Sequence, residues 1–252
     1  MPQDLPKLEE LMDAGAHFGH IRKRWHPKMS PYIFTIRNNV HIINLEKTRD
    51  CLGKAIDFIK QLMGEGKTIL FVGTKRQAKE AIKKTAVELN MPYIDFRWLG
   101  GTLTNFETVA KATNKLRTLE RQSEDKEFFE KMTKKERKNF LVELDKKDKT
   151  LGGIKEMKSL PDALFVIDAV EEKVAVAEAV KLEIPIAAII DSNSDPSKIA
   201  YPIPANDDSK LAVNLIMESI IKGAKKPKSE MTGKKNTDKE IKKIKKEKAE
   251  VK

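Results

Sequence analysis

Four short apolar runs constrain the fold of this 252-residue chain more than any other feature. They are TILFVGT, PYIDFRW, DALFVID and PIAAIID, at residues 68–74, 92–98, 162–168 and 185–191. Apolar residues are nearly continuous in each run, which is typical of strands covered on both faces in a parallel sheet. Helical patterns separate the runs. The order of elements therefore predicts an α/β fold with a doubly wound parallel sheet of the Rossmann or flavodoxin-like kind.

The stretches between and after these runs carry apolar residues at helical spacing. We expect helices over residues 52–63, 78–89, 171–182 and 207–223. Gly64 and Gly66 are expected to end the first helix, and Asp207 or Asp208 to cap the start of the last. Residues 32–45 predict a β-hairpin instead, because Asn38 and Asn39 tolerate the positive φ angles of a tight turn.

A fifty-residue stretch between Gly101 and Gly152 contains neither glycine nor proline. Its many Lys and Glu residues and few large apolar residues predict two antiparallel helices that pack along one side. We expect this inserted coiled-coil hairpin to turn near Gln122–Lys126 and, at about 30 Å for about 20 residues, to project from the sheet. The predicted parts are an α/β domain over 1–103 and 151–223, a hairpin over 104–150 and a basic, disordered tail over 224–252.

Positive charge is concentrated in two segments of the chain. The formal net charge is +11, and residues 222–252 hold 13 lysines against five acids. Residues 22–49 hold seven basic residues and one acid, interleaved with Trp25, Tyr32 and Phe34. Basic segments attract polyanions through counterion release, and aromatic rings pack against bases or sugars. The segment 22–49 therefore predicts a nucleic-acid surface, whereas the tail is equally consistent with a solubilising role.

Nothing in the sequence predicts export or membrane insertion. No run approaches the roughly 18 apolar residues of a membrane span, and MPQDLPKLEE resembles no secretory leader. The single Cys51 has no internal disulfide partner, so we expect a reducing cytoplasm.

Two loops that follow predicted strands could approach phosphate. GTKRQA (73–78) opens a helix, where backbone N–H groups, Lys75 and Arg76 could bind an anion. It lacks the pattern G-x-x-x-x-G-K-S/T, so nucleotide hydrolysis is not expected. RWLGGTLTN (97–105) combines Arg97 with a Gly-Gly turn that permits close backbone approach, and Thr102 or Thr104 could cap the following helix.

The histidines and strand-end acids do not form a catalytic or metal pattern. HFGH separates His17 and His20 by three positions, but no nearby Cys or carboxylate-rich set accompanies them, so no metal is expected. We interpret these two as fold-stabilising residues and His26 as a contact residue. Asp168 and Asp191 end strands where ligands of α/β sheets often bind, but no base or nucleophile is paired with them. No catalytic residue and no cofactor are therefore predicted.

Eight segments together resemble the bacterial form of the second-protein family of the small ribosomal subunit. They occur in the family's order and cover about residues 5–223. The segments are GAHFGH (15–20), RWHPKM (24–29), VHIINLEKT (40–48), FVGTKRQA (71–78), RWLGGTLTNF (97–106), LPDALFVID (160–168), IPIAAIIDSNSDP (184–196) and YPIPANDD (201–208). Ser194 stands where many members have Cys, and Ala205 where many have Gly.

The resemblance implies a non-enzymatic structural protein, ribosome-bound in the cytoplasm, at the junction of the head and body of the small subunit. Its partners would be small-subunit ribosomal RNA and neighbouring ribosomal proteins, including the first protein of the subunit, which captures messenger RNA. No membrane and no small-molecule substrate would be involved. By their positions in the motifs, the candidate RNA contacts are Arg22, Lys23, Arg24, His26, Lys28, Arg37, Lys75, Arg76 and Arg97. The alternative is an α/β enzyme or binding module for a small phosphorylated ligand at the strand ends.

Overall fold

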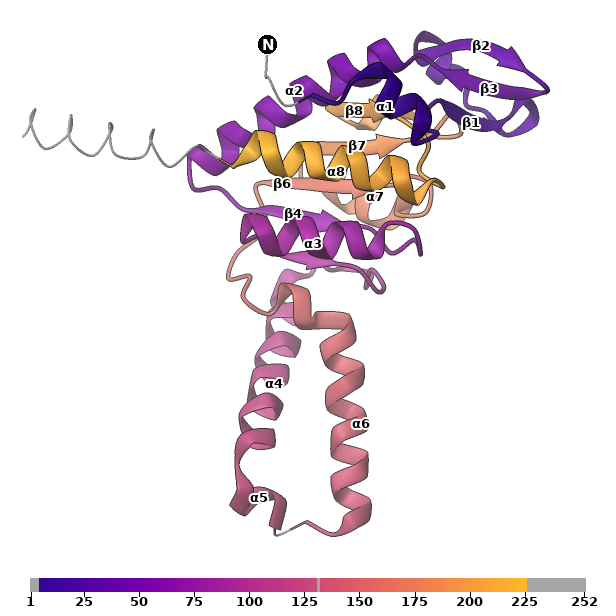
Figure 1. Cartoon of the computed structure of the whole chain (residues 1–252). Coiled ribbons are helices and arrows are strands. Elements are labelled where there is room, and N and C mark those ends of the chain that lie inside the picture. The colour runs from indigo at the N-terminus through magenta and orange to yellow at the C-terminus, as the bar shows by residue number, and fades with distance from the viewer. Residues whose placement is uncertain (1–4, 131, 226–252) are drawn as a thin grey trace, which may run out of the picture.

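The computed structural model describes residues 5–130 and 132–225, and its centre is a parallel five-stranded sheet (Figure 1). The strand order is β5-β4-β6-β7-β8. The strands are β4 (Ile69–Val72), β5 (Tyr93–Ile94), β6 (Ala163–Ile167), β7 (Ile186–Ile190) and β8 (Tyr201–Pro204). All neighbours in this sheet pair in parallel, which confirms the doubly wound α/β fold.

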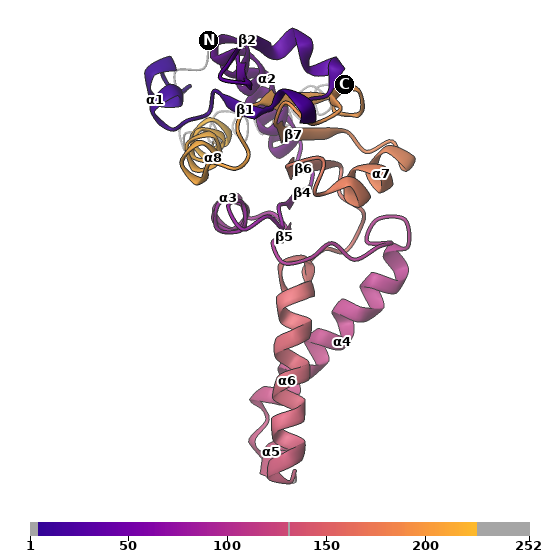
Figure 2. The ribbon, with the colours of Figure 1, turned by 90° about the vertical axis from the view of Figure 1, so that its right-hand side faces the viewer.

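Helices cover both faces of the sheet, as Figure 2 shows. One face packs against α1 (Leu8–Asp13), α2 (Leu45–Gly64), α3 (Lys79–Leu89) and α8 (Lys210–Ala224). The other packs against α7 (Lys173–Lys181), α4 (Phe106–Glu124) and the segment that precedes α4. Successive residues of a strand point to opposite faces, so Phe71 and Phe165 enter the first core and Leu70 and Leu164 the second. This two-sided burial explains why the apolar runs are continuous.

Two strands of the parallel sheet differ from the sequence prediction. The run at 92–98 forms only the two residues of β5, on one edge of the sheet. The other edge, β8, was not predicted, because Pro202 and Pro204 lack the N–H groups that a central strand needs. An edge strand tolerates them, since it pairs on one side only.

A second, antiparallel sheet has the order β1-β3-β2, with β1 (Phe18–Ile21), β2 (Ile33–Arg37) and β3 (Val40–Ile43). The predicted hairpin is confirmed, with Asn38 at φ 49° and Asn39 at φ 63° in its turn. The backbone N–H of His26 donates to the carbonyl oxygen of Ser192 over 2.8 Å. This bond joins the connection between β1 and β2 to the carboxyl end of β7.

A pair of long helices projects from the parallel sheet as an arm (Figures 1 and 2). They are α4 (Phe106–Glu124) and α6 (Lys134–Leu151), with the short α5 (Lys126–Glu130) between them. The connection is therefore longer than the turn predicted near Gln122–Lys126. Phe128 and Phe129 pack edge-on against Phe140 at the end of the arm, which stabilises this wider connection. Coiled-coil packing and the proposed domain boundaries stay predictions, and the predicted disordered tail lies largely outside the described residues.

Helix ends show which capping predictions hold. The first predicted helix ends at Gly64, as expected, and Gly66 follows with φ 74°. The prediction of Asp207 or Asp208 as the cap of α8 is wrong, because Ser209 accepts the bond from Ala212 N–H. Asp207 is fully buried and forms an ion pair with Lys75 instead. Among the described helices, none is both long and apolar enough to cross a membrane.

Candidate nucleic-acid interface

The connection between β1 and β2 presents three consecutive basic side chains to solvent. Residues Arg22–Arg24 form the 3-10 helix η1, and Pro27–Tyr32 form η2, whose Met29 is fully buried. Arg22, Lys23 and Arg24 are all exposed, and no ion pair of the described chain involves them. The buried Met29 holds the connection to the body, while the bases before it project outward.

The turn of the β2–β3 hairpin lies beside this basic connection. The backbone N–H of Arg22 donates to the carbonyl oxygen of Asn39 over 2.9 Å. Arg37, the last residue of β2, is exposed and pairs in register with Val40. Arg22, Lys23, Arg24 and Arg37 therefore gather at one end of the small sheet, which we call the basic end.

Aromatic residues of this segment divide into structural and exposed ones. Trp25 is half-buried and stacks on His41 with ring centroids 5.0 Å apart, and His41 is only 2% exposed. Phe34 on β2 is 71% exposed. The stacking of Trp25 stabilises the loop, whereas Phe34 has an open ring that could pack against a base or sugar.

His26 and Lys28 connect the basic segment to the loop after β7. The ammonium of Lys28 donates to Asp195 Oδ2 over 3.1 Å and to Ser197 Oγ over 2.5 Å. Asp195 also accepts from the hydroxyl and the backbone N–H of Ser197, and these two bonds, with Lys28 nearby, hold the pKa of this carboxyl well below its ordinary value. Nδ1 of His26 accepts from the backbone N–H of Lys28. Both predicted contact residues thus have a local structural role as well.

Lys75 does not reach outward as the sequence suggested. Its ammonium lies 2.6 Å from Asp207, 2.6 Å from Asp208 and 3.1 Å from Asp168, and its side chain is only 18% exposed. Burial lowers the pKa of Lys75, but the aspartates outweigh it and raise that pKa above its ordinary value. Whether Lys75 contacts RNA stays a prediction. The neighbouring Arg76 is exposed.

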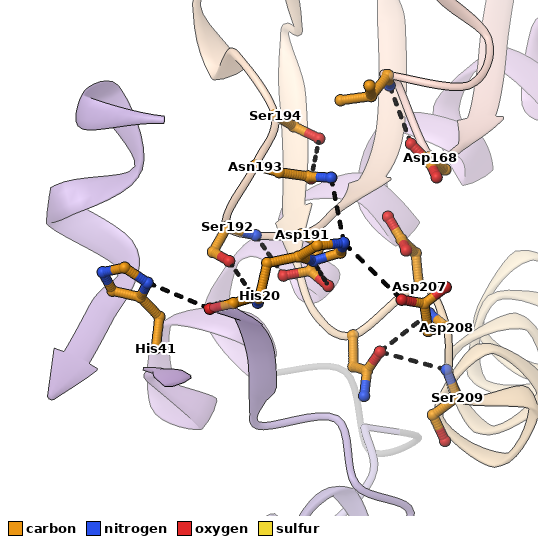
Figure 3. A network of polar contacts seen from close by, with 12 residues as sticks. His20, His41, Asp168, Asp191, Ser192, Asn193, Ser194, Asp207, Asp208 and Ser209 are labelled. Carbon is orange, nitrogen blue, oxygen red and sulfur yellow. Dashed lines mark hydrogen bonds and ion pairs between the residues drawn. The ribbon is translucent and has the colours of Figure 1, made fainter. Parts of the chain in front are cut away.

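Aspartates dominate the carboxyl ends of the parallel strands, as Figure 3 shows. Asp168, Asp191, Asp207 and Asp208 lie around Lys75 and His20. Asp207 is fully buried, and burial, followed by the charges of Asp168 and Asp191, raises its pKa to about 7. A phosphate would meet mainly negative charge here. The arrangement argues against a small phosphorylated ligand at the strand ends.

His20 pairs with residues far away in the sequence. Its Nδ1 lies 2.8 Å from Asp191 Oδ2, and this bond raises the pKa of His20 despite partial burial. Ligand atoms of His20, Asp191 and Asp208 lie within 4.8 Å of one another, so this set could hold a divalent cation. The spacing in HFGH suggested His17 as the partner of His20, but His17 packs against Phe18 instead.

The strand-end groups are not arranged as a nucleophile and its base. The hydroxyl of Ser192 accepts from the backbone N–H of His20 over 2.8 Å, and no bond of the described chain links it to the imidazole. Nucleophilic catalysis needs a base within hydrogen-bond reach of the attacking hydroxyl. Asp168 adopts a positive φ of 68° and accepts from the backbone N–H groups of Val170 and Glu171. These bonds support a structural interpretation of the loop.

The Gly-Gly loop after β5 faces inward, toward Glu178 of α7. This buried carboxylate accepts from the N–H groups of Gly101, Leu103 and Thr104, at 2.7, 2.9 and 3.0 Å. Trp98 Nε1 donates to it as well, over 3.0 Å. Burial raises the pKa of Glu178, but these bonds outweigh it and lower that pKa below its ordinary value.

These bonds change the interpretation of the loop. The backbone N–H groups of Gly101, Leu103 and Thr104 already donate to the carboxylate of Glu178. They are therefore not available to bind phosphate, contrary to what the Gly-rich sequence suggested. The predicted caps are wrong as well, because the Thr102 hydroxyl donates to Leu99 and the Thr104 hydroxyl to Glu178. Arg97 remains exposed at the start of the loop. Glu178 was not among the predicted site residues, although an acid within the apolar stretch AVAEAV could have indicated a buried carboxylate.

Residues 11–227 match the family model described as Ribosomal protein S2. The match includes the parallel sheet, the small antiparallel sheet and the arm. It therefore covers the elements that carry every candidate contact residue.

Proposed function

The chain belongs to the ribosomal protein S2 family, and we propose that it binds small-subunit ribosomal RNA mainly through the basic end of the small sheet. Membership makes it a structural protein of the small ribosomal subunit, with a role in translation. Proteins of this family associate with ribosomal RNA and with other ribosomal proteins. The role of the family is structural and not enzymatic.

One observation carries the proposal: the basic end combines four exposed bases without a paired acid among the described residues. Arg22, Lys23, Arg24 and Arg37 lie together because the backbone of Arg22 bonds to the hairpin turn. Unpaired bases keep their full charge for phosphates, and each contact releases condensed counterions. The guanidinium groups can also bind phosphate in a bidentate way.

The remaining candidate residues differ in how available their side chains are for contact with RNA. Arg76 and Arg97 are exposed after β4 and β5, so we assign them direct contacts. His26 and Lys28 contact RNA only from positions that the loop after β7 already determines. Lys75 contacts RNA least, because three aspartates occupy its ammonium.

The finer placement of the protein rests on the resemblance of its motifs. We place it at the junction of the head and body, where it supports docking of the first protein of the subunit, on cytoplasmic ribosomes. Co-purification tests this: particles that lack the chain should retain less of the first protein than particles that contain it. Equal retention would overturn the docking role.

Reconstitution tests the RNA surface. A variant with Arg22→Gln, Lys23→Gln and Arg24→Gln is added to small subunits depleted of the protein, and retention is measured against salt. A control with Lys54→Gln, Lys84→Gln and Lys222→Gln removes three lysine charges elsewhere on the body. Retention of the first variant should weaken strongly. The slope of the logarithm of its binding constant against the logarithm of salt concentration should become smaller by about one for each lost phosphate contact. Circular dichroism checks that both variants fold; retention equal to that of the control would overturn the proposal.

A further inference from the structure

A second basic surface lies between α3 and the base of the arm. It is a groove of about 330 Å³, lined by four lysines and two aspartates together with Tyr93, Phe96 and a Gly-Gly turn. The lysines are Lys79 and Lys83 on α3, Lys149 on α6, and Lys155 just after the arm. None of them is among the contact residues discussed above. We call this site the arm-base groove.

One wall of the groove offers unpaired positive charge. Lys79 and Lys83 lie one helical turn apart on α3 and therefore project from the same side. No ion pair of the described chain involves either ammonium. The ammonium of Lys79 lies over the ring of Phe96, 5.2 Å from its centroid, and Phe96 is 50% exposed. A cation and a partly exposed aromatic ring thus lie together on this wall.

The opposite wall is held in place by close packing. Lys149 pairs with Asp145 over 2.6 Å, and Lys155 pairs with Glu120 over 2.8 Å. A Cβ atom at Gly153 would overlap the carbonyl oxygen of Tyr93, so only glycine lets the arm base approach β5 this closely. Backbone packing therefore determines how closely the base of the arm approaches β5.

Two candidate contacts described above are close to the groove along the chain. Arg76 precedes Lys79 by three residues, and Arg97 directly follows Phe96; both arginines are exposed. Several cations beside a partly exposed ring match a strand with regularly spaced phosphates and planar bases. An acidic protein surface would match the lysines but would leave the ring without a specific role.

We infer that the arm-base groove binds the sugar–phosphate backbone of ribosomal RNA, with Phe96 packed against a base or ribose. Lys79 and Lys83 contact phosphates directly, and the paired Lys149 and Lys155 add positive potential across the groove. This inference rests on the proposed RNA-binding function and adds a contact surface at the root of the arm.

A matched pair of variants tests the inference in depleted small subunits. Lys79→Gln with Lys83→Gln removes two charges from the groove. Lys84→Gln with Lys222→Gln removes two from the surface between α3 and α8, where Lys84 pairs with Glu218. The groove variant should bind on the order of tenfold more weakly or worse, with a salt dependence smaller by about two, while the control is unchanged. Phe96→Ala should weaken binding without changing the salt dependence.

Amine footprinting of the unmodified protein supplies the second measurement. Lys79 and Lys83 should lose reactivity on entry into the subunit, whereas Lys84 should keep it. A groove variant that equals the control, or lysines that stay reactive in the subunit, would overturn the inference. Lysines that crosslink to an acidic protein and not to RNA would overturn it as well. If the unmodified chain itself fails to enter subunits, the proposed function is wrong. If the unmodified chain enters and the groove variant behaves like the control, only the inference about the groove is wrong.

Discussion

The carboxyl ends of the parallel strands and the basic end of the small sheet use charged residues in opposite ways. At the strand ends, the ammonium of Lys75 lies among three aspartates and is mostly buried. At the basic end, Arg22, Lys23 and Arg24 are exposed and have no acidic partner among the described residues. Buried, paired charges affect the stability of the fold, whereas exposed, unpaired charges are available to a partner. Substitutions should therefore change stability at one region and binding at the other.

The largest effect is expected for Lys75→Met. Removing this ammonium leaves Asp168, Asp207 and Asp208 without their shared counter-charge, which should lower the free energy of unfolding by about 3 kcal/mol. Urea denaturation measures the loss, and Lys75→Arg, which keeps the charge, should lose less. If Lys75→Met is as stable as the parent but no longer enters small subunits, Lys75 is an RNA contact and the comparison fails.

An intermediate effect is expected for Glu178→Ala, which removes the acceptor of the Gly-Gly loop. The uncompensated N–H groups should cost about 2 kcal/mol, while Glu171→Ala on the exposed surface nearby should cost much less.

The effect of Glu178→Ala should also depend on pH. The pKa of Glu178 is lowered in the folded protein, so its carboxylate stabilises the fold above the ordinary value of 4.5. That contribution is lost as pH falls through the lowered pKa. Unfolding of parent and variant, compared at neutral pH and below 4.5, checks this; a stability difference independent of pH would contradict a role for the ionised carboxylate.

The smallest effect on stability is expected for Arg37→Ala at the basic end. The free energy of unfolding should change by less than about 0.5 kcal/mol, because the side chain is exposed and unpaired in the described structure. Retention in small subunits should nevertheless weaken, with a salt dependence smaller by about one. Lys54→Ala, at an exposed position of α2 outside the segment 22–49, is the control. A stability loss without any change in retention would show that Arg37 belongs with the structural charges.

Much of the fold could be predicted because its signals are local. Continuous apolar runs predicted β4, β6 and β7, and the stretch without glycine or proline predicted the helices of the arm. The signals failed where a neighbour decides the structure. Strand β8 contains two prolines and forms because it lies on an edge. Helix α5 follows the predicted turn and lengthens the connection, because its Phe128 and Phe129 pack against Phe140 of α6.

The candidate site shows the same difference between features that depend on residues close in the sequence and features that depend on residues close only in space. The clustering of bases near Trp25 is visible in the sequence, because those residues are close along the chain. The clustering at the arm-base groove is not, since its lysines come from segments about seventy residues apart. Glu178 was missed for the same reason, because its partners lie more than seventy residues earlier.

The sequence by itself determined the alternation of strands and helices, the helical arm and the basic segment, because periodicity and composition act between neighbouring residues. Only the tertiary structure decided which charges remain free. Lys75 and Arg24 are both basic residues in loops, but the fold brings Asp207, 132 positions later, against Lys75 and brings no acid of the described chain against Arg24. Electrostatic pairing depends on distance in space, and the chain sets that distance only when the sheet has formed.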